Sequence, residues 1–266
     1  MEKVSLTVVI IARDEAENLR HLLPHLTWAS RVIVVGNHCQ DETAQVAREN
    51  GAEYLENGAE SFAKMRESVL EKIETEWVFY LDADERVTRD LAEEIAQKLA
   101  HSAGVAAYRL RRENYHYGVK MTGGGWQNDT VVRLLRRSTL RGWDGEIHES
   151  PVFEGETQTL NAPLLHFTHR GTAANLAKSS RWTIKEARLL AAARQTPVRP
   201  STILRKVIME FYRRFWQQRG YRDGMAGFVE ALVQACNRGF VYIQVWECMQ
   251  KPSIEQRYEK LEESLN

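Results

Sequence analysis

The feature that most constrains the fold is a fourfold alternation of strand-like and helix-like segments in the first 81 residues. Short apolar runs alternate with segments whose apolar residues recur at helical spacing. This alternation is typical of βαβ units, and it predicts a parallel sheet with right-handed crossovers. The predicted strands are 5–12, 31–35, 52–55 and 77–81, and the predicted helices between them are 14–26, 41–50 and 62–73.

After residue 86 this pattern changes. A further helix is predicted at 88–100, and shorter strands are predicted at 105–111 and 130–136. The connection at 114–129 is rich in glycine and aromatic residues. Long connections inside compact domains are usually functional, so we expect this one to be a binding loop. From residue 176 onward the chain is predicted to be helical.

Composition excludes several functional classes. The 266 residues are 43% hydrophobic and 27% charged, as in an ordinary soluble globular protein. The 36 basic residues balance the 36 acidic ones, so overall charge indicates no nucleic acid partner. Three cysteines without metal-ligand spacing suit free thiols in a reducing compartment.

No targeting or membrane-spanning segment is evident in the sequence. The early apolar run at 6–12 is too short for a signal peptide, and no run of 18 apolar residues occurs. We therefore expect a cytoplasmic protein. Peripheral association with the inner face of the cytoplasmic membrane is left open.

Two carboxylates one residue apart, Asp82 and Asp84, directly follow the fourth predicted strand. Open α/β sheets bind ligands beyond the carboxyl ends of their strands. Such a pair could hold Mg²⁺ or Mn²⁺, which takes its remaining ligands from water and substrate phosphates. The pair could equally cap the helix that follows, because acidic residues are favoured near helix N-termini.

Polar loops also follow the first two predicted strands, at 12–19 and 35–43. In a parallel sheet these loops lie at the same edge as Asp82 and Asp84, where they could contact a nucleotide. The sequence contains neither GxGxxG nor GxxxxGK(S/T). A nucleotide would therefore be held by edge contacts and a metal rather than by a glycine-rich cradle.

Several motifs in this order resemble the GT-A domain of glycosyltransferase family 2. The first are Ala-Arg-Asp-Glu-Ala-Glu-Asn-Leu at 12–19, Asp-Glu-Thr at 41–43 and Leu-Asp-Ala-Asp-Glu-Arg-Val at 81–87. Gly-Gly-Trp at 124–126, Arg-Leu at 133–134, Gly-Glu-Ile-His-Glu at 145–149 and Leu-His at 165–166 continue the resemblance. Together they are most similar to bacterial lipopolysaccharide-core β-1,4-glucosyltransferase-like proteins.

The resemblance implies the fold class and the domain organisation. The fold would be an α/β, Rossmann-like GT-A domain with a mixed central sheet, followed by a helical C-terminal appendage. The catalytic domain would span 1–175, with a donor half at 1–100 and an acceptor half at 101–175. The helical region would span 176–266.

The resemblance also implies a nucleotide-diphospho-sugar donor, with UDP-glucose as the first candidate, and Mn²⁺ or Mg²⁺ at its diphosphate. The family commonly has an aspartate at the end of the second strand, where this chain has Gly36, so Asp41 is the nearest substitute. The implied metal ligands are Asp82, Asp84 and His148. The implied donor-binding residues are Ala12, Asp14, Glu15, Asn37, Asp41, Lys64, Asp82, Ala83 and Asp84.

An inverting transfer also requires a general base within hydrogen-bond reach of the attacking hydroxyl. We favour Glu149, which adjoins His148 in the best-matching motif, and keep Glu146 in reserve. The alternative is a solvated acidic turn. His166 and His169 are further candidates for a metal ligand or a diphosphate contact, although a single histidine is more often structural.

Trp126 and Arg133 are the expected acceptor contacts. Trp126 could stack on a sugar ring, or it could simply pack in the core. Arg133 follows from the resemblance alone.

The C-terminal helices indicate a second interaction. Residues 203–216 form a basic amphipathic segment, and residues 178–223 contain twelve basic and three acidic residues. Such a helix is typical of an anionic membrane interface. Packing on the catalytic domain or on another subunit is the alternative, so a homo-oligomer is also open. The expected apolar stripe comprises Leu204, Val207, Ile208, Phe211 and Phe215.

The sequence therefore predicts an inverting, metal-dependent glycosyltransferase that moves a hexose to a cell-envelope glycolipid such as lipopolysaccharide core. One alternative is transfer to polyprenyl phosphate, whose phosphate needs no strong base. The other is a catalytically inactive module with a sugar-nucleotide fold.

Overall fold

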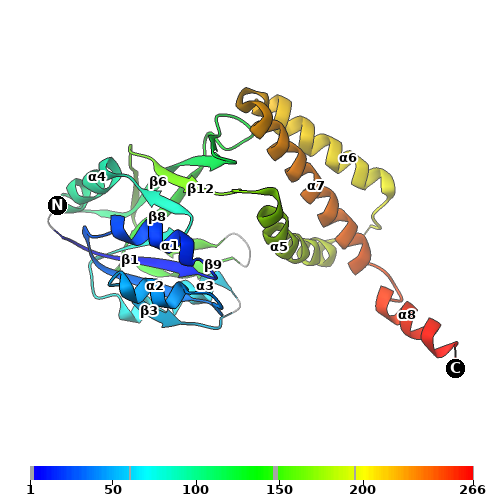
Figure 1. Cartoon of the computed structure of the whole chain (residues 1–266), viewed down its shortest axis with the longest axis horizontal. Helices are drawn as coiled ribbons and strands as arrows, with labels where there is room; N and C mark the ends of the chain where they lie inside the picture. The colour runs from blue at the N-terminus through cyan, green and yellow to red at the C-terminus, as the bar shows by residue number, and fades with distance from the viewer. Residues whose placement is uncertain (1–2, 60, 146–148, 195, 266) are drawn as a thin grey trace. The chain divides into compact units, whose positions relative to one another are not determined.

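The computed structural model describes residues 3–59, 61–145, 149–194 and 196–265 (Figure 1). It divides into two compact units. Unit 1 comprises residues 1–114 and 128–168, and unit 2 comprises residues 115–127 and 169–266. Compact packing does not establish independent folding, so the domain division expected from the sequence stays a prediction.

The parallel half of the unit 1 sheet follows the predicted alternation. In spatial order it consists of β3 (Glu53–Glu56), β2 (Ala29–Gly36), β1 (Val4–Ala12) and β4 (Trp77–Asp82). β1 pairs in parallel with both β2 and β4. All four strands agree with their predicted positions within two residues.

The first three helices of this half are shorter than the sequence pattern suggested, and the fourth matches the predicted 88–100 within one residue. They are α1 (Ala16–Leu22), α2 (Thr43–Glu49), α3 (Phe62–Glu67) and α4 (Arg89–Ala100). α1 gives way to a 3₁₀ turn at Leu23–His25 because proline at position 24 lacks the amide that an α-helix interior requires. The segment predicted as one helix at 62–73 divides into α3 and a 3₁₀ turn at Leu70–Lys72.

The second half of the unit 1 sheet is mixed, which confirms the predicted fold class. β8 (Thr130–Arg136) runs antiparallel to β4, and β6 (Val105–His116) runs antiparallel to β8. β12 (Leu164–Phe167) and β5 (Glu85–Val87) complete the order, and β11 (Glu156–Thr159) pairs with β6. β9 (Leu140–Asp144) and β10 (Ser150–Phe153) form a separate antiparallel pair.

The core of unit 1 lies on both faces of this sheet. Side chains alternate along a strand, so Val8 and Ile10 join one apolar cluster, with residues of α1 and α4, while Val9 joins the other. All three are buried. This two-sided burial fixes the strand register, and it brings the carboxyl ends of β1, β2 and β4 to one edge of the sheet.

Unit 2 is largely helical, as predicted from residue 176 onward. Its helices are α5 (Thr172–Ala193), α6 (Pro200–Tyr212), α7 (Gly224–Cys248) and α8 (Ile254–Glu263). α7 packs against both α5 and α6, as Figure 1 shows. A π-helical turn at Arg213–Gln217 and a 3₁₀ turn at Gly220–Asp223 connect α6 to α7. No helix among the described residues is both long and apolar enough to cross a membrane.

The rest of unit 2 is the loop at 115–127, which contains β7 (Val119–Lys120). Asp223 accepts hydrogen bonds from the backbone amides of Thr122 (2.8 Å) and Gly123 (2.9 Å). A Cβ at Gly123 would lie 2.2 Å from the carbonyl oxygen of Arg219, so only glycine fits this close approach. The glycine-rich loop is therefore a packed part of the helical unit.

Candidate functional site

The loops after β1 and β2 are joined by side-chain hydrogen bonds from three predicted donor-binding residues. The carboxylate of Asp14 accepts from the amide of Gln40 (2.7 Å), and that of Asp41 accepts from the amide of Ala16 (3.0 Å). The amide of Glu15 donates to the Thr43 hydroxyl (2.9 Å). The structure thus brings Asp14, Glu15 and Asp41 together, as expected from the parallel topology.

Asp41 is held in its ionised form. Burial raises its pKa. Hydrogen bonds from the Thr43 hydroxyl and from the amides of Ala16 and Thr43 lower the pKa by more, so it lies below its ordinary value. Both carboxylate oxygens of Asp41 accept these bonds. Asp41 therefore acts in this structure as a loop-positioning residue.

The end of β2 is occupied by polar side chains despite the glycine at its last position. A Cβ at Gly36 would lie 1.8 Å from the hydroxyl of Tyr54, so the tyrosine fills the space of the missing side chain. The Tyr54 hydroxyl donates to Glu56 (2.5 Å). Asn37 is buried and its amide donates to the carbonyls of Asn57 (2.9 Å) and residue 59 (3.0 Å). Asn37 thus fixes the loop beside the site.

Asp82, at the end of β4, is paired with arginines. Arg133 of β8 donates to its Oδ2, and Arg66 of α3 lies 3.7 Å from its Oδ1. Burial raises the pKa of Asp82, but the positive charges of Arg133 and Arg66 outweigh this effect and lower the pKa overall. Arg133, expected at the acceptor, lies beside a carboxylate expected at the donor.

Asp84 lies beside a histidine from a distant strand. Its Oδ2 is 3.5 Å from Nε2 of His166. The antiparallel pairing of β5 with β12 places His166 opposite Glu85, next to Asp84 in the chain. The other ring nitrogen, Nδ1, is 2.7 Å from Oδ1 of Asn114. Asn114 thus orients the imidazole so that Nε2 faces Asp84. Ala83, between the two aspartates, is buried.

A buried charge network that the sequence analysis missed lies beneath these aspartates. Glu85 is fully buried and accepts from the backbone amide of Asp82 (2.9 Å). Arg112 lies 3.3 Å from Glu85 and donates to Asp129 (2.8 Å). Burial raises the pKa of Glu85, and the negative charge of Asp82 raises it further. The glutamate after the second aspartate was the only sequence signal for this network.

Glu149 lies in a cavity of unit 1 of about 820 Å³. Arg66 Nη1 is 3.4 Å from its Oε2. The same guanidinium also reaches Asp82, so one arginine links the two carboxylates. The other oxygen, Oε1, is buried and has no hydrogen-bond partner among the described residues. The cavity is lined by four arginines and two acids: Arg66, Arg109, Arg112, Arg133, Asp129 and Glu149.

Arg66 itself was missed because nothing local distinguishes it from other basic residues on helix surfaces. Its side chain is only 7% exposed, and it stacks 4.6 Å from the ring centroid of Trp143. Burial lowers its pKa, as does the nearby charge of Arg133. Lys64, the donor-binding residue expected from the sequence on this helix, is exposed.

The remaining predicted residues are placed as follows. Ala12 is the buried last residue of β1. Trp126 lies in unit 2, where its ring contacts those of His116 and His169. Glu146 and His148 lie outside the described residues, so their roles stay predictions.

The chain was compared with known proteins. A family model for glycosyl transferase family 2 matches residues 7–178. Over 244 residues the chain is 25% identical to the lipopolysaccharide core biosynthesis glycosyltransferase LpsC of Rhizobium meliloti (strain 1021), covering 88% of each protein. A Rickettsia typhi protein described as an uncharacterized glycosyltransferase is 23% identical over 251 residues, covering 90% of this chain and 85% of that protein.

Solved structures resemble the chain more distantly. A glucosyl-3-phosphoglycerate synthase from Mycobacterium tuberculosis, in complex with Mn²⁺, UDP and glucosyl-3-phosphoglycerate, has a TM-score of 0.44 and 12% identity over 70% of this chain and 78% of that chain.

Proposed function

The chain belongs to glycosyltransferase family 2, and we propose that it is an inverting, metal-dependent hexosyltransferase that uses a nucleotide-diphospho-sugar donor. Its role as a glycosyltransferase follows from the family. The observation that carries the finer proposal is the buried oxygen of Glu149 that has no partner among the described residues, in the same cavity as Arg66 and Arg133, which both pair with Asp82.

We infer that Asp84 and His166 hold the metal. The 3.5 Å between Oδ2 and Nε2 is close to the separation of two ligand atoms on one divalent ion. Asn114 orients the imidazole in the way that an outer partner orients a metal-bound histidine. A bound Mn²⁺ or Mg²⁺ would stabilise negative charge on the departing diphosphate. Asp82 is less available because its two oxygens face arginines.

In the proposed reaction Glu149 accepts a proton as the acceptor hydroxyl attacks the donor. The carboxylate takes the proton of the acceptor hydroxyl at Oε1, while Arg66 holds Oε2 and fixes the orientation of the carboxyl group. The hydroxyl oxygen attacks the anomeric carbon as the bond to the diphosphate breaks. Attack opposite to the leaving group inverts the configuration at that carbon.

The acceptor is proposed to be an anionic saccharide of a cell-envelope glycolipid, such as lipopolysaccharide core. The relative from Rhizobium meliloti supports this class of acceptor by its name. The cavity supports it through its four arginines, whose guanidinium groups are good hydrogen-bond donors to acidic groups of a saccharide. Glucose from UDP-glucose remains the first candidate for the transferred group.

A thermal-shift screen tests the donor site. We expect UDP to raise the melting temperature of the full chain when Mn²⁺ is present and to have little effect in EDTA. At a ligand concentration 100 times Kd, binding stabilises the folded state by about 2.7 kcal/mol. GDP, dTDP and CMP serve as matched controls for the base. If no nucleotide shifts the melting temperature with Mn²⁺, the donor-site proposal fails.

We further propose that α6 and α7 contact an anionic membrane surface. Part of the expected apolar stripe packs against α7. Phe211 and Phe215 pack with Phe228, and Val207 packs against Gly239, where an added Cβ would lie 2.8 Å from it. The other two residues of the stripe are exposed, and they form a row with two aromatic residues at a four-residue spacing. Each residue of this row is 54–62% exposed: Leu204, Ile208, Tyr212 and Trp216.

Apolar side chains in the first half of α7 are exposed as well. Met225 is 76% exposed and Leu232 is 44% exposed. Basic residues border the row, including the exposed Arg205. Apolar side chains flanked by positive charge suit the boundary between lipid headgroups and acyl chains. A glycolipid acceptor would be reached from such a surface.

Sedimentation with liposomes tests this surface. We expect the chain to sediment with phosphatidylserine-containing vesicles at low salt and to be released at 0.5 M NaCl, because salt screens the attraction. The double variant Ile208→Ser and Trp216→Ser should lose binding. Leu261→Ser is the matched control, since Leu261 is 61% exposed but lies on α8. Equal sedimentation of both variants, or dimerisation that depends on Ile208, would contradict the proposal.

A further inference from the structure

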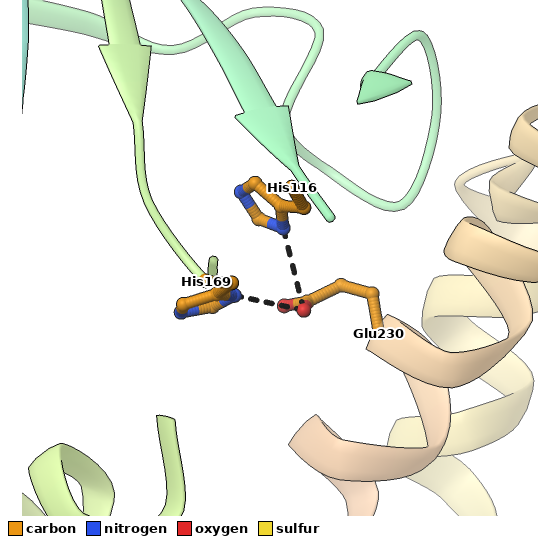
Figure 2. Close-up of side chains that lie close together, drawn as sticks. All are labelled: His116, His169 and Glu230. Atoms are coloured by element: carbon orange, nitrogen blue, oxygen red, sulfur yellow. Dashed lines mark hydrogen bonds and ion pairs between the residues drawn. The ribbon is translucent and has the colours of Figure 1, made fainter. Parts of the chain in front are cut away.

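Unit 2 contains a buried cluster of two histidines and one glutamate. His116 ends β6, His169 follows β12, and Glu230 lies on α7. Figure 2 shows both imidazoles turned towards the same carboxylate. Nδ1 of His169 is 2.8 Å from Oε2 of Glu230, and Nδ1 of His116 is 3.3 Å from the same oxygen.

The cluster is well protected from water. The side chains of His116 and Glu230 are 0% and 2% exposed, and that of His169 is 13% exposed. The ring of Trp126 lies edge-on to both imidazoles, with centroid distances of 4.6 and 5.9 Å. In such a setting polar side chains need partners, because burying a polar or charged group without one is costly.

The three side chains are of the types that bind a divalent cation. Such an ion binds neutral imidazole nitrogens and an ionised carboxylate directly.

The geometry is also that of a metal site. One ligand atom from each of the three residues lies within 4.8 Å of the other two. Zinc bound tetrahedrally to nitrogen and oxygen at 2.0–2.2 Å separates its ligand atoms by about 3.4 Å. The 3.3 Å between His116 and Glu230 matches this value, whereas the 2.8 Å between His169 and Glu230 is that of a hydrogen bond, which a bound ion would replace.

An outer partner completes the arrangement. The amide of Gln234, one turn along α7, donates to Oε1 of Glu230 at 2.9 Å. This bond orients the carboxylate so that Oε2 faces the imidazoles. Metal-binding carboxylates are commonly held by such hydrogen bonds.

We propose that His116, His169 and Glu230 form a zinc site in unit 2, with water as the fourth ligand. Its residues are different from those inferred to hold the donor metal, so it is an additional site. Its ligands come from three segments that are far apart in the sequence. A bound ion would cross-link the 115–127 loop, the segment after β12 and α7, and so stabilise the unit.

Zinc binding to the full chain tests this proposal. The protein is stripped with a chelator and titrated with Zn²⁺ against a chromophoric competitor, with bound metal counted by mass spectrometry. We expect one tight site per chain that survives the Asp84→Ala substitution. Glu230→Gln, which keeps the shape of the side chain, should weaken zinc binding by on the order of 100-fold, whereas His101→Ala, which removes an exposed histidine outside the cluster, should not.

A second measurement covers variants that fail to fold. Co²⁺ added to the stripped wild-type chain should give the strong visible absorption bands of tetrahedral coordination, and Zn²⁺ should abolish them. Zinc should also raise the melting temperature of the wild type, and less so that of His169→Ala. The proposal is overturned if the wild type binds no stoichiometric Zn²⁺ and shows no tetrahedral Co²⁺ bands, which would leave a purely hydrogen-bonded cluster.

Discussion

Replacement of Glu149 by glutamine is expected to lower kcat by about 10²–10⁴-fold, which is the range that general base catalysis contributes. The amide keeps the size of the side chain but cannot accept the proton of the acceptor hydroxyl. Donor binding should persist, because in the described part of the chain Arg66 is what links Glu149 to Asp82. Initial rates with UDP-glucose and a saccharide acceptor, together with UDP binding by calorimetry, measure the two effects separately.

The matched control is Glu154→Gln, which removes an exposed carboxylate shortly after Glu149 in the chain. It should leave kcat within about twofold of wild type, since substitutions at exposed sites have small effects. A large loss in Glu146→Gln with a normal rate in Glu149→Gln would move the base to Glu146. Normal rates in both variants would instead favour a phosphate acceptor such as polyprenyl phosphate, which needs no strong base.

Replacement of Asp84 by asparagine should have an effect of similar size through a different step. The amide weakens metal binding and leaves negative charge on the departing diphosphate unstabilised. Metal ions contribute several kcal/mol to such transition states, so kcat should fall by about 10³-fold. Stabilisation by UDP should also lose its dependence on Mn²⁺, which a thermal-shift titration measures.

Two comparisons make the Asp84 result specific. Asp90→Asn removes an exposed carboxylate in the first turn of α4 and should retain both activity and the Mn²⁺ response. His166→Ala should reproduce the Asp84 phenotype, because both side chains are inferred to bind one ion. A fully active Asp84→Asn enzyme that also resists EDTA would show that the reaction proceeds without a metal at this position.

Sequence patterns located the secondary structure of the donor half well. Strands of a parallel sheet are apolar on both faces, so β1, β2 and β4 appear in the sequence as continuous apolar runs. Their parallel order then placed Asp14, Asp41 and Asp82 at one sheet edge without any knowledge of side-chain contacts. The resemblance to glycosyltransferase family 2 is likewise confirmed by the family match over residues 7–178.

Partners of the acidic residues could not be read in the same way. Asp84 meets His166 because β5 and β12 pair across roughly 80 residues of chain, and nothing local to either residue encodes that register. The sequence could name His166 only as one candidate among several histidines. Arg66 and Glu149, separated by 83 positions, likewise meet only through tertiary packing.

The sequence by itself therefore determined the family, the alternation of strands and helices, and the sheet edge at which Asp82 and Asp84 lie. Only the tertiary structure decided that Asp82 faces arginines, that Asp84 faces His166, and that His116 and His169 share Glu230. Local periodicity records which side of a segment is buried, because burial repeats with the geometry of the helix or strand. Pairing between charged groups depends on the packing of segments far apart in the chain, where one residue of register changes every contact.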